Sequence, residues 1–158
     1  MIEIHIDYEG DLHCNALHHP SGNRLVTDAP VDNNGRGEAF SPTDLVATAL
    51  GTCMATVLGI VAKRKDLELA GMTVKVRKHM SEDLPRRISR LEVDLSVPLP
   101  SEHPSRSLLE AAAQACPVAH SLHPDISVAL NWQWLEPPSI NLQASPAVAD
   151  SARLISGK

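Results

Sequence analysis

The segment that most constrains the fold of this chain is SPTDLVATALGTCMATVLGIVAKRKD, residues 41–66. Ser41 is a favourable N-cap, the proline after it suits the first helical position, and the carboxylate of Asp44 can reach back to unpaired N–H groups of the first turn. From 45 to 61 the only polar side chains are three threonines, and three basic residues follow where the helix macrodipole favours cations. The segment therefore predicts one long helix, apolar on nearly all sides and largely buried, with Cys53 at its middle.

Composition excludes several classes of partner. The 158 residues predict a single domain, and a formal net charge of -5 gives no attraction to nucleic acid or to an anionic membrane. The apolar stretch 45–62 is long enough to raise the question of a membrane span, but its caps, threonines and glycines favour a buried core helix. The N-terminus lacks the pattern of a secretion signal, and three cysteines, an odd number, argue against a disulfide framework. We therefore expect a cytoplasmic protein without a membrane span, in which a functional cysteine is reactive or binds metal.

Hydrophobic periodicity predicts the elements around the long helix. Alternating apolar residues indicate six strands, at residues 1–8, 12–18, 25–27, 72–79, 88–97 and 126–134. A second helix over 105–115 breaks at Cys116, because Pro117 cannot donate an N–H and biases the residue before it away from helical geometry. This order is typical of an α+β fold.

The boundaries of the domain and its oligomeric state follow from the same patterns. We expect the domain to cover residues 1–136, followed by a poorly ordered tail at 137–158, where prolines and small polar residues show no period. A long helix that is apolar all round needs more cover than a single six-stranded sheet provides on one face. We therefore predict that a second copy of the chain covers it in a homodimer.

The three thiols differ in their surroundings. Cys14 shares the parity of apolar residues on a predicted strand and is expected to fill the core, and Cys53 taken alone can be a small hydrophobe in the same way. Cys116 lies at a helix break, where free N–H groups of the following turn can stabilise a thiolate. If packing brings Cys53 and Cys116 together, one sulfur can attack an oxidant and the other can resolve the product as a disulfide.

Two segments carry a resemblance to a known family. SPTDLVATALGTCMATVL and AAAQACPVAHSL, about sixty residues apart, resemble the two cysteine motifs of the OsmC/Ohr superfamily of thiol-dependent peroxidases, and the predicted order of elements up to residue 134 resembles its fold. The loop sequence TDAPVDNNGRGEAFSPTDL is more similar to the OsmC-like branch than to the best-characterised hydroperoxide reductases. The resemblance implies an antiparallel sheet wrapped around long central helices in an intertwined homodimer, with two sites at the interface.

The resemblance also implies roles for the two cysteines. Cys53 matches the family cysteine that attacks the O–O bond of an organic hydroperoxide and becomes a sulfenic acid. Cys116 matches the cysteine that condenses with it to a disulfide, which a dithiol reductant reopens. No cofactor and no metal are implied.

The charged residues that accompany the first thiol in the family are harder to match to positions in this sequence. In the family an arginine activates the first thiol and a glutamate orients that arginine; Arg36 is the best candidate here and Arg24 the runner-up. The position of the glutamate holds Thr43, with Asp44 next to it. Because a helix rises about 1.5 Å per residue, both lie roughly 14 to 15 Å along the axis from Cys53, so a second chain must supply them. Asp44 is equally expected as part of the helix cap.

Other patterns are weaker, and the function has alternatives. Eight histidines show no spacing typical of a metal site, so His120, His123 and the pair at 18–19 are expected to be structural or solvated. The sequence favours a cytoplasmic, antioxidant thiol peroxidase of the oxidative stress response. The first alternative is a non-catalytic dimeric module that binds a small apolar ligand at the dimer interface, and the second is a disulfide or persulfide handler without peroxide specificity.

Overall fold

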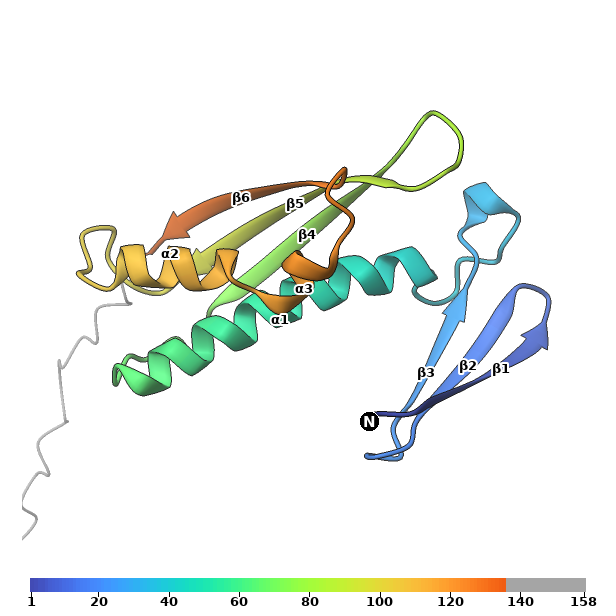
Figure 1. Cartoon of the computed structure of the whole chain (residues 1–158), viewed down its shortest axis with the longest axis horizontal. Coiled ribbons are helices and arrows are strands. Elements are labelled where there is room, and N and C mark those ends of the chain that lie inside the picture. The colour runs from blue at the N-terminus through green and yellow to red at the C-terminus, as the bar shows by residue number, and fades with distance from the viewer. Residues whose placement is uncertain (136–158) are drawn as a thin grey trace, which may run out of the picture.

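The computed structural model describes residues 1–135, so the predicted tail at 137–158 lies outside the described residues. Within these described residues, six strands and three α-helices follow one another in the predicted order (Figure 1). The elements are β1 (Ile4–Gly10), β2 (His13–His18), β3 (Arg24–Asp28), a 3-10 turn η1 (Val31–Asn33), α1 (Pro42–Arg64), β4 (Thr73–Met80), β5 (Ile88–Val97), α2 (Arg106–Gln114), α3 (Pro117–Ser121) and β6 (Ser127–Trp134). The α+β class is thus confirmed.

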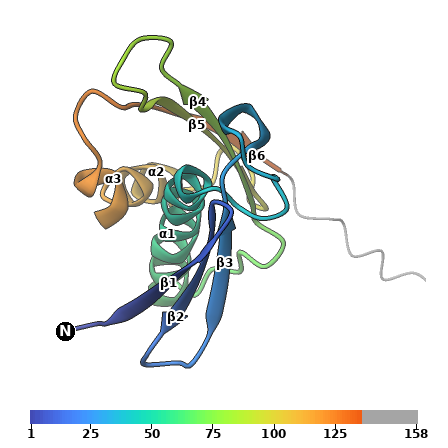
Figure 2. The same ribbon diagram turned by 90° about the vertical axis from the view of Figure 1, so that its right-hand side faces the viewer.

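The strands form two three-stranded sheets, in the orders β1-β2-β3 and β4-β5-β6. Within one chain the two sheets are separate, and β5 pairs with β6 in parallel, so the sheet that the resemblance implies is not antiparallel throughout. A parallel pair needs a long crossover, and α2 and α3 supply it. In Figure 2, which looks nearly along α1, the C-terminal sheet, α1 and the crossover helices surround one core, and the N-terminal sheet lies outside it.

The start of α1 is held by the predicted cap. The Asp44 N–H donates to Ser41 Oγ at 3.2 Å, and the Ser41 N–H donates to the Asp44 carboxylate at 2.9 Å, which completes a capping box. Pro42 stands at the first helical position, and the last turn carries Lys63 and Arg64. The prediction of a helix over 41–66 is therefore confirmed to within two residues at its end.

One side of α1 packs on the inner face of the C-terminal sheet. Leu50, Met54 and Leu58 are buried there together with alternate residues of β5, among them Leu91 and Leu95. Gly51 lies so close to β4 that an added Cβ would stand 2.8 Å from a methyl carbon of Val76. The absence of a side chain at this position therefore sets how near the helix approaches the sheet.

The opposite side of α1 is uncovered in the single chain. The prediction of a largely buried helix is therefore wrong for one chain by itself. Only a third of its most apolar 18-residue stretch is buried, and by length and composition alone the helix could cross a membrane. The three exposed threonines on this side donate their hydroxyls to carbonyls of their own helix, at 2.9, 2.7 and 2.8 Å. Their hydrogen-bonding capacity is thus largely used within the helix, which leaves a surface of small side chains available for packing.

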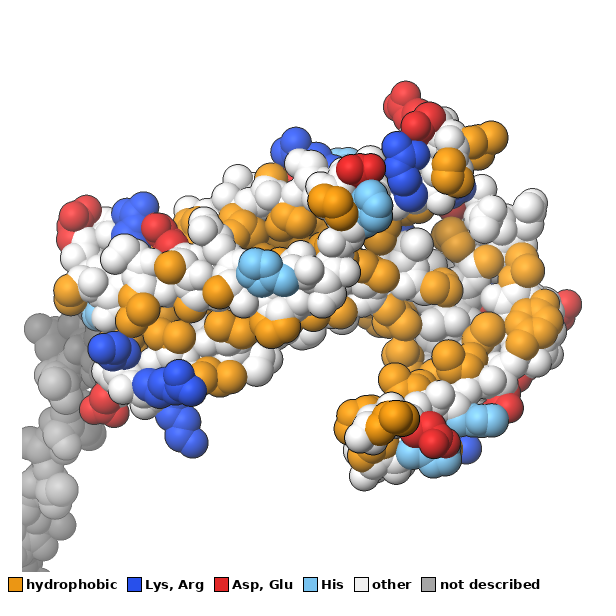
Figure 3. Space-filling model, viewed as in Figure 1, with side chains coloured by type: hydrophobic (Ala, Val, Ile, Leu, Met, Phe, Trp, Pro, Cys, Tyr) orange, Lys and Arg blue, Asp and Glu red, His pale blue; other side chains and the backbone are white. Residues whose placement is uncertain are grey.

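The N-terminal sheet is also uncovered. Alternation in its first strand predicts a half-buried face, but Ile4, Ile6 and Tyr8 are 57%, 63% and 66% exposed. In the space-filling view this sheet stands away from the body of the molecule across a hollow with many hydrophobic side chains on its walls (Figure 3). A three-stranded sheet needs a covered hydrophobic face for stability, so both uncovered surfaces point to packing against something outside the single chain.

The capping box provides a first test. Ser41→Ala is expected to lower the free energy of unfolding by about 1 kcal/mol, because it removes the acceptor for an N–H of the first turn. Ser105 is the matched control: it is the N-cap of α2, but its side chain makes no capping hydrogen bond. Ser105→Ala should change the stability by less than about 0.5 kcal/mol. Urea unfolding at equal protein concentrations measures both, and equal losses would contradict the role given to Ser41.

Candidate functional site

Two of the predicted site residues meet in the core. Cys53 comes from the middle of α1, and Cys116 is the residue at which α2 gives way to α3, with φ -58° and ψ 127°. Pro117 is the first residue of α3, so the predicted break is confirmed. The two thiols lie in the same core cluster, and the Cys53 side chain is close enough to Cys116 to raise the pKa of its thiol. Cys116 is 0% exposed, whereas Cys53 is partly exposed.

The surroundings of Cys116 keep it protonated. Burial raises the pKa of its thiol above the ordinary value, and the Cys53 side chain raises it further. The backbone N–H groups of Ala119 and Val118 act in the opposite direction, as predicted for the turn after the break. Their effect is the smaller one, because a buried sulfur loses more hydration than two N–H groups restore. The turn therefore favours a thiolate at Cys116 as expected, but burial and Cys53 outweigh it and the pKa of the thiol is raised overall.

The candidate arginines lie in the N-terminal part of the chain. Arg36, in the loop before α1, binds the Asp11 carboxylate of the β1–β2 turn at 3.0 Å and is 60% exposed. Arg24, on β3, donates to the Asn15 side chain at 3.2 Å. Each guanidinium thus has a polar partner within its own chain, and the pairing of Arg36 with Cys53 stays a prediction.

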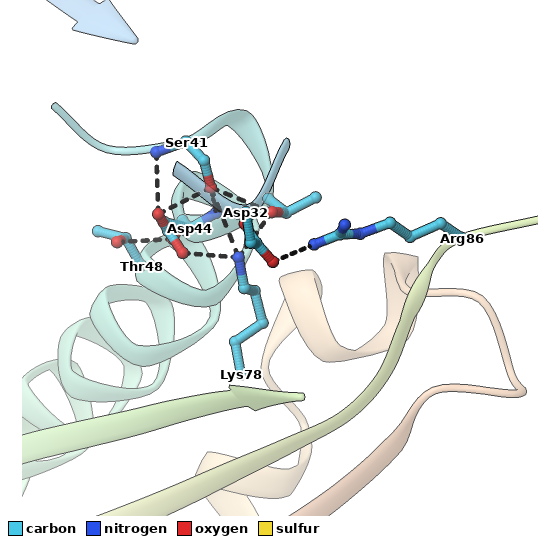
Figure 4. A network of polar contacts seen from close by, with 7 residues as sticks. Asp32, Ser41, Asp44, Thr48, Lys78 and Arg86 are labelled. Carbon is cyan, nitrogen blue, oxygen red and sulfur yellow. Dashed lines mark hydrogen bonds and ion pairs between the residues drawn. The ribbon is translucent and has the colours of Figure 1, made fainter. Parts of the chain in front are cut away.

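A lysine that the sequence analysis missed organises the start of α1 (Figure 4). The Lys78 ammonium group, from β4, lies 2.7 Å from the Asp44 carboxylate and donates to Thr43 Oγ1 at 2.7 Å. Desolvation raises the pKa of Asp44, but hydrogen bonds from Lys78 and Ser41 outweigh it, so the pKa is lowered. Asp44 therefore caps the helix as expected, and Thr43, at the position of the family acid, is bound to a cation of its own chain.

A groove of about 740 Å³ runs between α1 and β4. Its lining is mainly apolar and comprises Ala39, Phe40, Asp44, Ala47, Thr48, Gly51, Thr52, Ala55, Met72, Val74, Val76 and Lys78. Cys53 lies two residues from Gly51 and two from Ala55, and a helix turns by about 100° per residue. The thiols and the groove are therefore on opposite sides of α1, and a ligand in the groove would not touch the thiols of the same chain.

The loop that carries Arg36 is anchored by a second pair that the sequence analysis missed. The Asp28 side chain is 1% exposed, and one carboxylate oxygen lies 2.8 Å from His13 Nδ1. The other oxygen accepts the Glu38 N–H at 3.0 Å. The hydrogen bond with His13 lowers the pKa of Asp28, burial opposes this, and the Glu38 N–H lowers it further. Asp28 thus joins the N-terminal sheet to the loop before α1.

Within residues 1–135 no group of three or more potential metal ligands occurs. His120 is exposed, and the His18 ring bonds the Ser21 hydroxyl at 2.7 Å.

Comparison with known proteins defines the class. The family model described as OsmC-like protein matches residues 35–131. A solved structure from Psychrobacter arcticus 273-4, described as an osmotic stress induced and detoxification response protein, is 42% identical, with a TM-score of 0.79 over 84% of this chain and 96% of that one. This chain therefore belongs to the OsmC-like family.

More distant structures share the fold. The organic hydroperoxide resistance protein OsmC of Legionella pneumophila is 13% identical, with a TM-score of 0.69 over 84% of this chain and 96% of that one. An OsmC like protein from Mycoplasma pneumoniae is 14% identical, with a TM-score of 0.72 over 86% of this chain and 98% of that one. A comparison with curated protein sequences found no match.

The Asp28 anchor predicts a pH-dependent stability. Because the pKa of Asp28 is lower in the folded state, its contribution is present above the unfolded-state value near 4 and is lost as the pH falls through the folded-state value. Asp28→Asn should therefore lower the free energy of unfolding at pH 7, and the difference from wild type should shrink by pH 3. Urea titrations at both pH values measure this. Asp125→Asn, at a carboxylate that is 74% exposed, is the control, and an unchanged Asp28→Asn difference at pH 3 would contradict the role of the charge.

Proposed function

We propose that this protein is a cytoplasmic two-cysteine thiol peroxidase that reduces organic hydroperoxides. The observation that carries the proposal is the proximity of Cys53 and Cys116 in one core cluster, two thiols from segments 63 residues apart in the sequence. A relative of the same fold is named for organic hydroperoxide resistance, and the 42% identical one for a detoxification response. A role in the oxidative stress response fits both names.

The surroundings of the two sulfurs support a division of labour. Cys53, the more exposed thiol, attacks the distal oxygen of the hydroperoxide as a thiolate, the O–O bond breaks, and the alcohol leaves after taking up a proton. Cys53 is then a sulfenic acid. Cys116 gives up its proton as its sulfur attacks the Cys53 sulfur, the S–O bond breaks, and the hydroxyl leaves with that proton as water, which forms the disulfide. A dithiol returns both residues to thiols.

The activating cation in this proposal is Arg36 of a second copy, with Arg24 as the runner-up. A guanidinium near Cys53 would lower the thiol pKa and raise the thiolate fraction. The loop of Arg36 is anchored by Asp28 next to the start of α1, and α1 is uncovered along the side that a second copy can reach. Thr43 and Asp44, which are bound to Lys78, would accompany that loop rather than contact the thiols of their own chain.

The chain is proposed to act as a homodimer. The uncovered side of α1 carries small and apolar groups, and the N-terminal sheet leaves large apolar side chains exposed. Surfaces of this kind are typical of interfaces between copies.

The groove favours a second candidate function. Its mostly apolar lining could hold a small apolar ligand in a non-catalytic dimeric module. In that case the thiols would alkylate only on unfolding, and native mass spectrometry would find a co-purified ligand.

The proposed peroxidase activity is tested by replacing the two thiols. Cys53→Ser is expected to reduce the consumption of cumene and t-butyl hydroperoxide, with a dithiol present, to the uncatalysed rate, because the attacking sulfur is gone. Cys116→Ser should leave a Cys53 sulfenic acid that oxidises further to the sulfinic acid, seen by mass spectrometry. Cys14→Ser is the matched control and should retain activity. If wild type consumes no more hydroperoxide than Cys53→Ser, the peroxidase proposal fails.

The arginine candidates are separated in the same assay. Arg36→Met should lower kcat/KM and shift the alkylation of Cys53 to higher pH, whereas Arg24→Met should leave both near the wild-type values. The reverse result would assign the activating role to Arg24.

The proposed homodimer is tested by placing a charge on the uncovered side of α1. Thr56→Lys places an uncompensated cation on the uncovered side of α1, and it should convert the protein to monomers in sedimentation velocity experiments. Thr73→Lys makes the same change at an exposed position on β4 and should leave the dimer intact. Wild-type protein that sediments as a monomer at micromolar concentration would refute the homodimer.

A further inference from the structure

We infer that the dithiol reductant opens the Cys53–Cys116 disulfide at one sulfur only: it attacks Sγ of Cys53, and Cys116 departs as the leaving group. This inference rests on the proposed two-cysteine cycle. It adds the order in which the disulfide is taken apart and the residue that carries the mixed disulfide.

Access to the two sulfurs carries the inference. A thiolate attacks a disulfide along the S–S axis, from the side opposite the departing sulfur, so the rate depends on which sulfur can be reached. Cys116 is 0% exposed, and so are Leu109 and Ala113, seven and three residues before it on the face of α2 that enters the core. An attack on Cys116 would have to come through the core. Cys53 is partly exposed, so its sulfur is the one of the two that a reductant can reach from solvent.

The surroundings of Cys116 favour its departure from the disulfide and disfavour its attack on the mixed disulfide that remains on Cys53. As the S–S bond breaks, its electron pair moves to Cys116 Sγ, and the N–H groups of Val118 and Ala119 stabilise the charge. Because the pKa of this thiol is raised, the sulfur then takes up a proton, which balances the proton that the attacking reductant thiol has lost. A protonated Cys116 attacks the mixed disulfide slowly, since the thiolate is the nucleophile. The mixed disulfide on Cys53 therefore persists until it is resolved.

The second thiol of the reductant completes the step. It attacks the reductant sulfur that is bound to Cys53, the mixed disulfide breaks, and Cys53 leaves as a thiolate. The reductant departs as a disulfide, having lost the two electrons that the protein disulfide gained. A dithiol can do this within one molecule, whereas a monothiol must wait for a second collision. A preference for dithiols over monothiols thus follows from the slow attack of Cys116 on the mixed disulfide.

The test locates the mixed disulfide directly. The full chain with Cys14→Ser, run beside wild type, is oxidised with diamide, a thiol oxidant, so that the result does not depend on peroxidase activity. It is then exposed briefly to excess 2-mercaptoethanol and quenched with iodoacetamide, and peptide mass spectrometry locates the adducts. We expect at least about tenfold more mercaptoethanol on Cys53 than on Cys116, because only one sulfur is accessible.

Two results would overturn the inference: equal or greater labelling of Cys116, or no disulfide between the two cysteines after diamide. Failure of the proposed function is distinguishable from both. If the diamide disulfide opens at Cys53 but cumene hydroperoxide is consumed no faster than by Cys53→Ser, the peroxidase proposal fails and the inference stands.

Discussion

The close contact between α1 and β4 is the constraint on which the other features of this structure depend. Gly51 allows it, because a Cβ there would collide with Val76. Once one side of the helix is fixed against the sheet, its rotation about its own axis is fixed as well. Cys53 then faces the crossover helices, and the threonine side faces outward. The close approach at this one position is thus linked both to the direction in which the thiol points and to the surface of α1 that stays uncovered.

The parts of the structure that the sequence predicts well are those with local causes. The first turn of α1 is specified by Ser41 and Asp44 within four residues, and the structure contains the capping box they imply. The break at Cys116 follows from the covalent geometry of Pro117, which acts only on its neighbours. Because both cysteines lie on such locally specified elements, their positions along the helices could be predicted before any tertiary contact was known.

The remaining features depend on contacts between distant segments. The parallel direction of β6 depends on how the crossover packs, which no residue of β6 encodes by itself. The exposure of the first strand depends on what lies outside the chain. Lys78 did leave a signal, because it shares the parity of Val74 and Val76 on β4 and so points inward. The sequence gives no such signal for Asp28, because acidic residues are common at strand ends and only the structure shows that this one is buried.

The place of Cys116 within the crossover has a consequence for synthesis of the protein. The segment between β5 and β6 is anchored at both ends by strand pairing, and Cys116 lies inside it. A nascent chain that has emerged only as far as α3 already contains all three cysteines but lacks the strand that closes the crossover. Cys53 and Cys116 are thus brought together by a crossover whose far end is fixed only by the last described strand, β6.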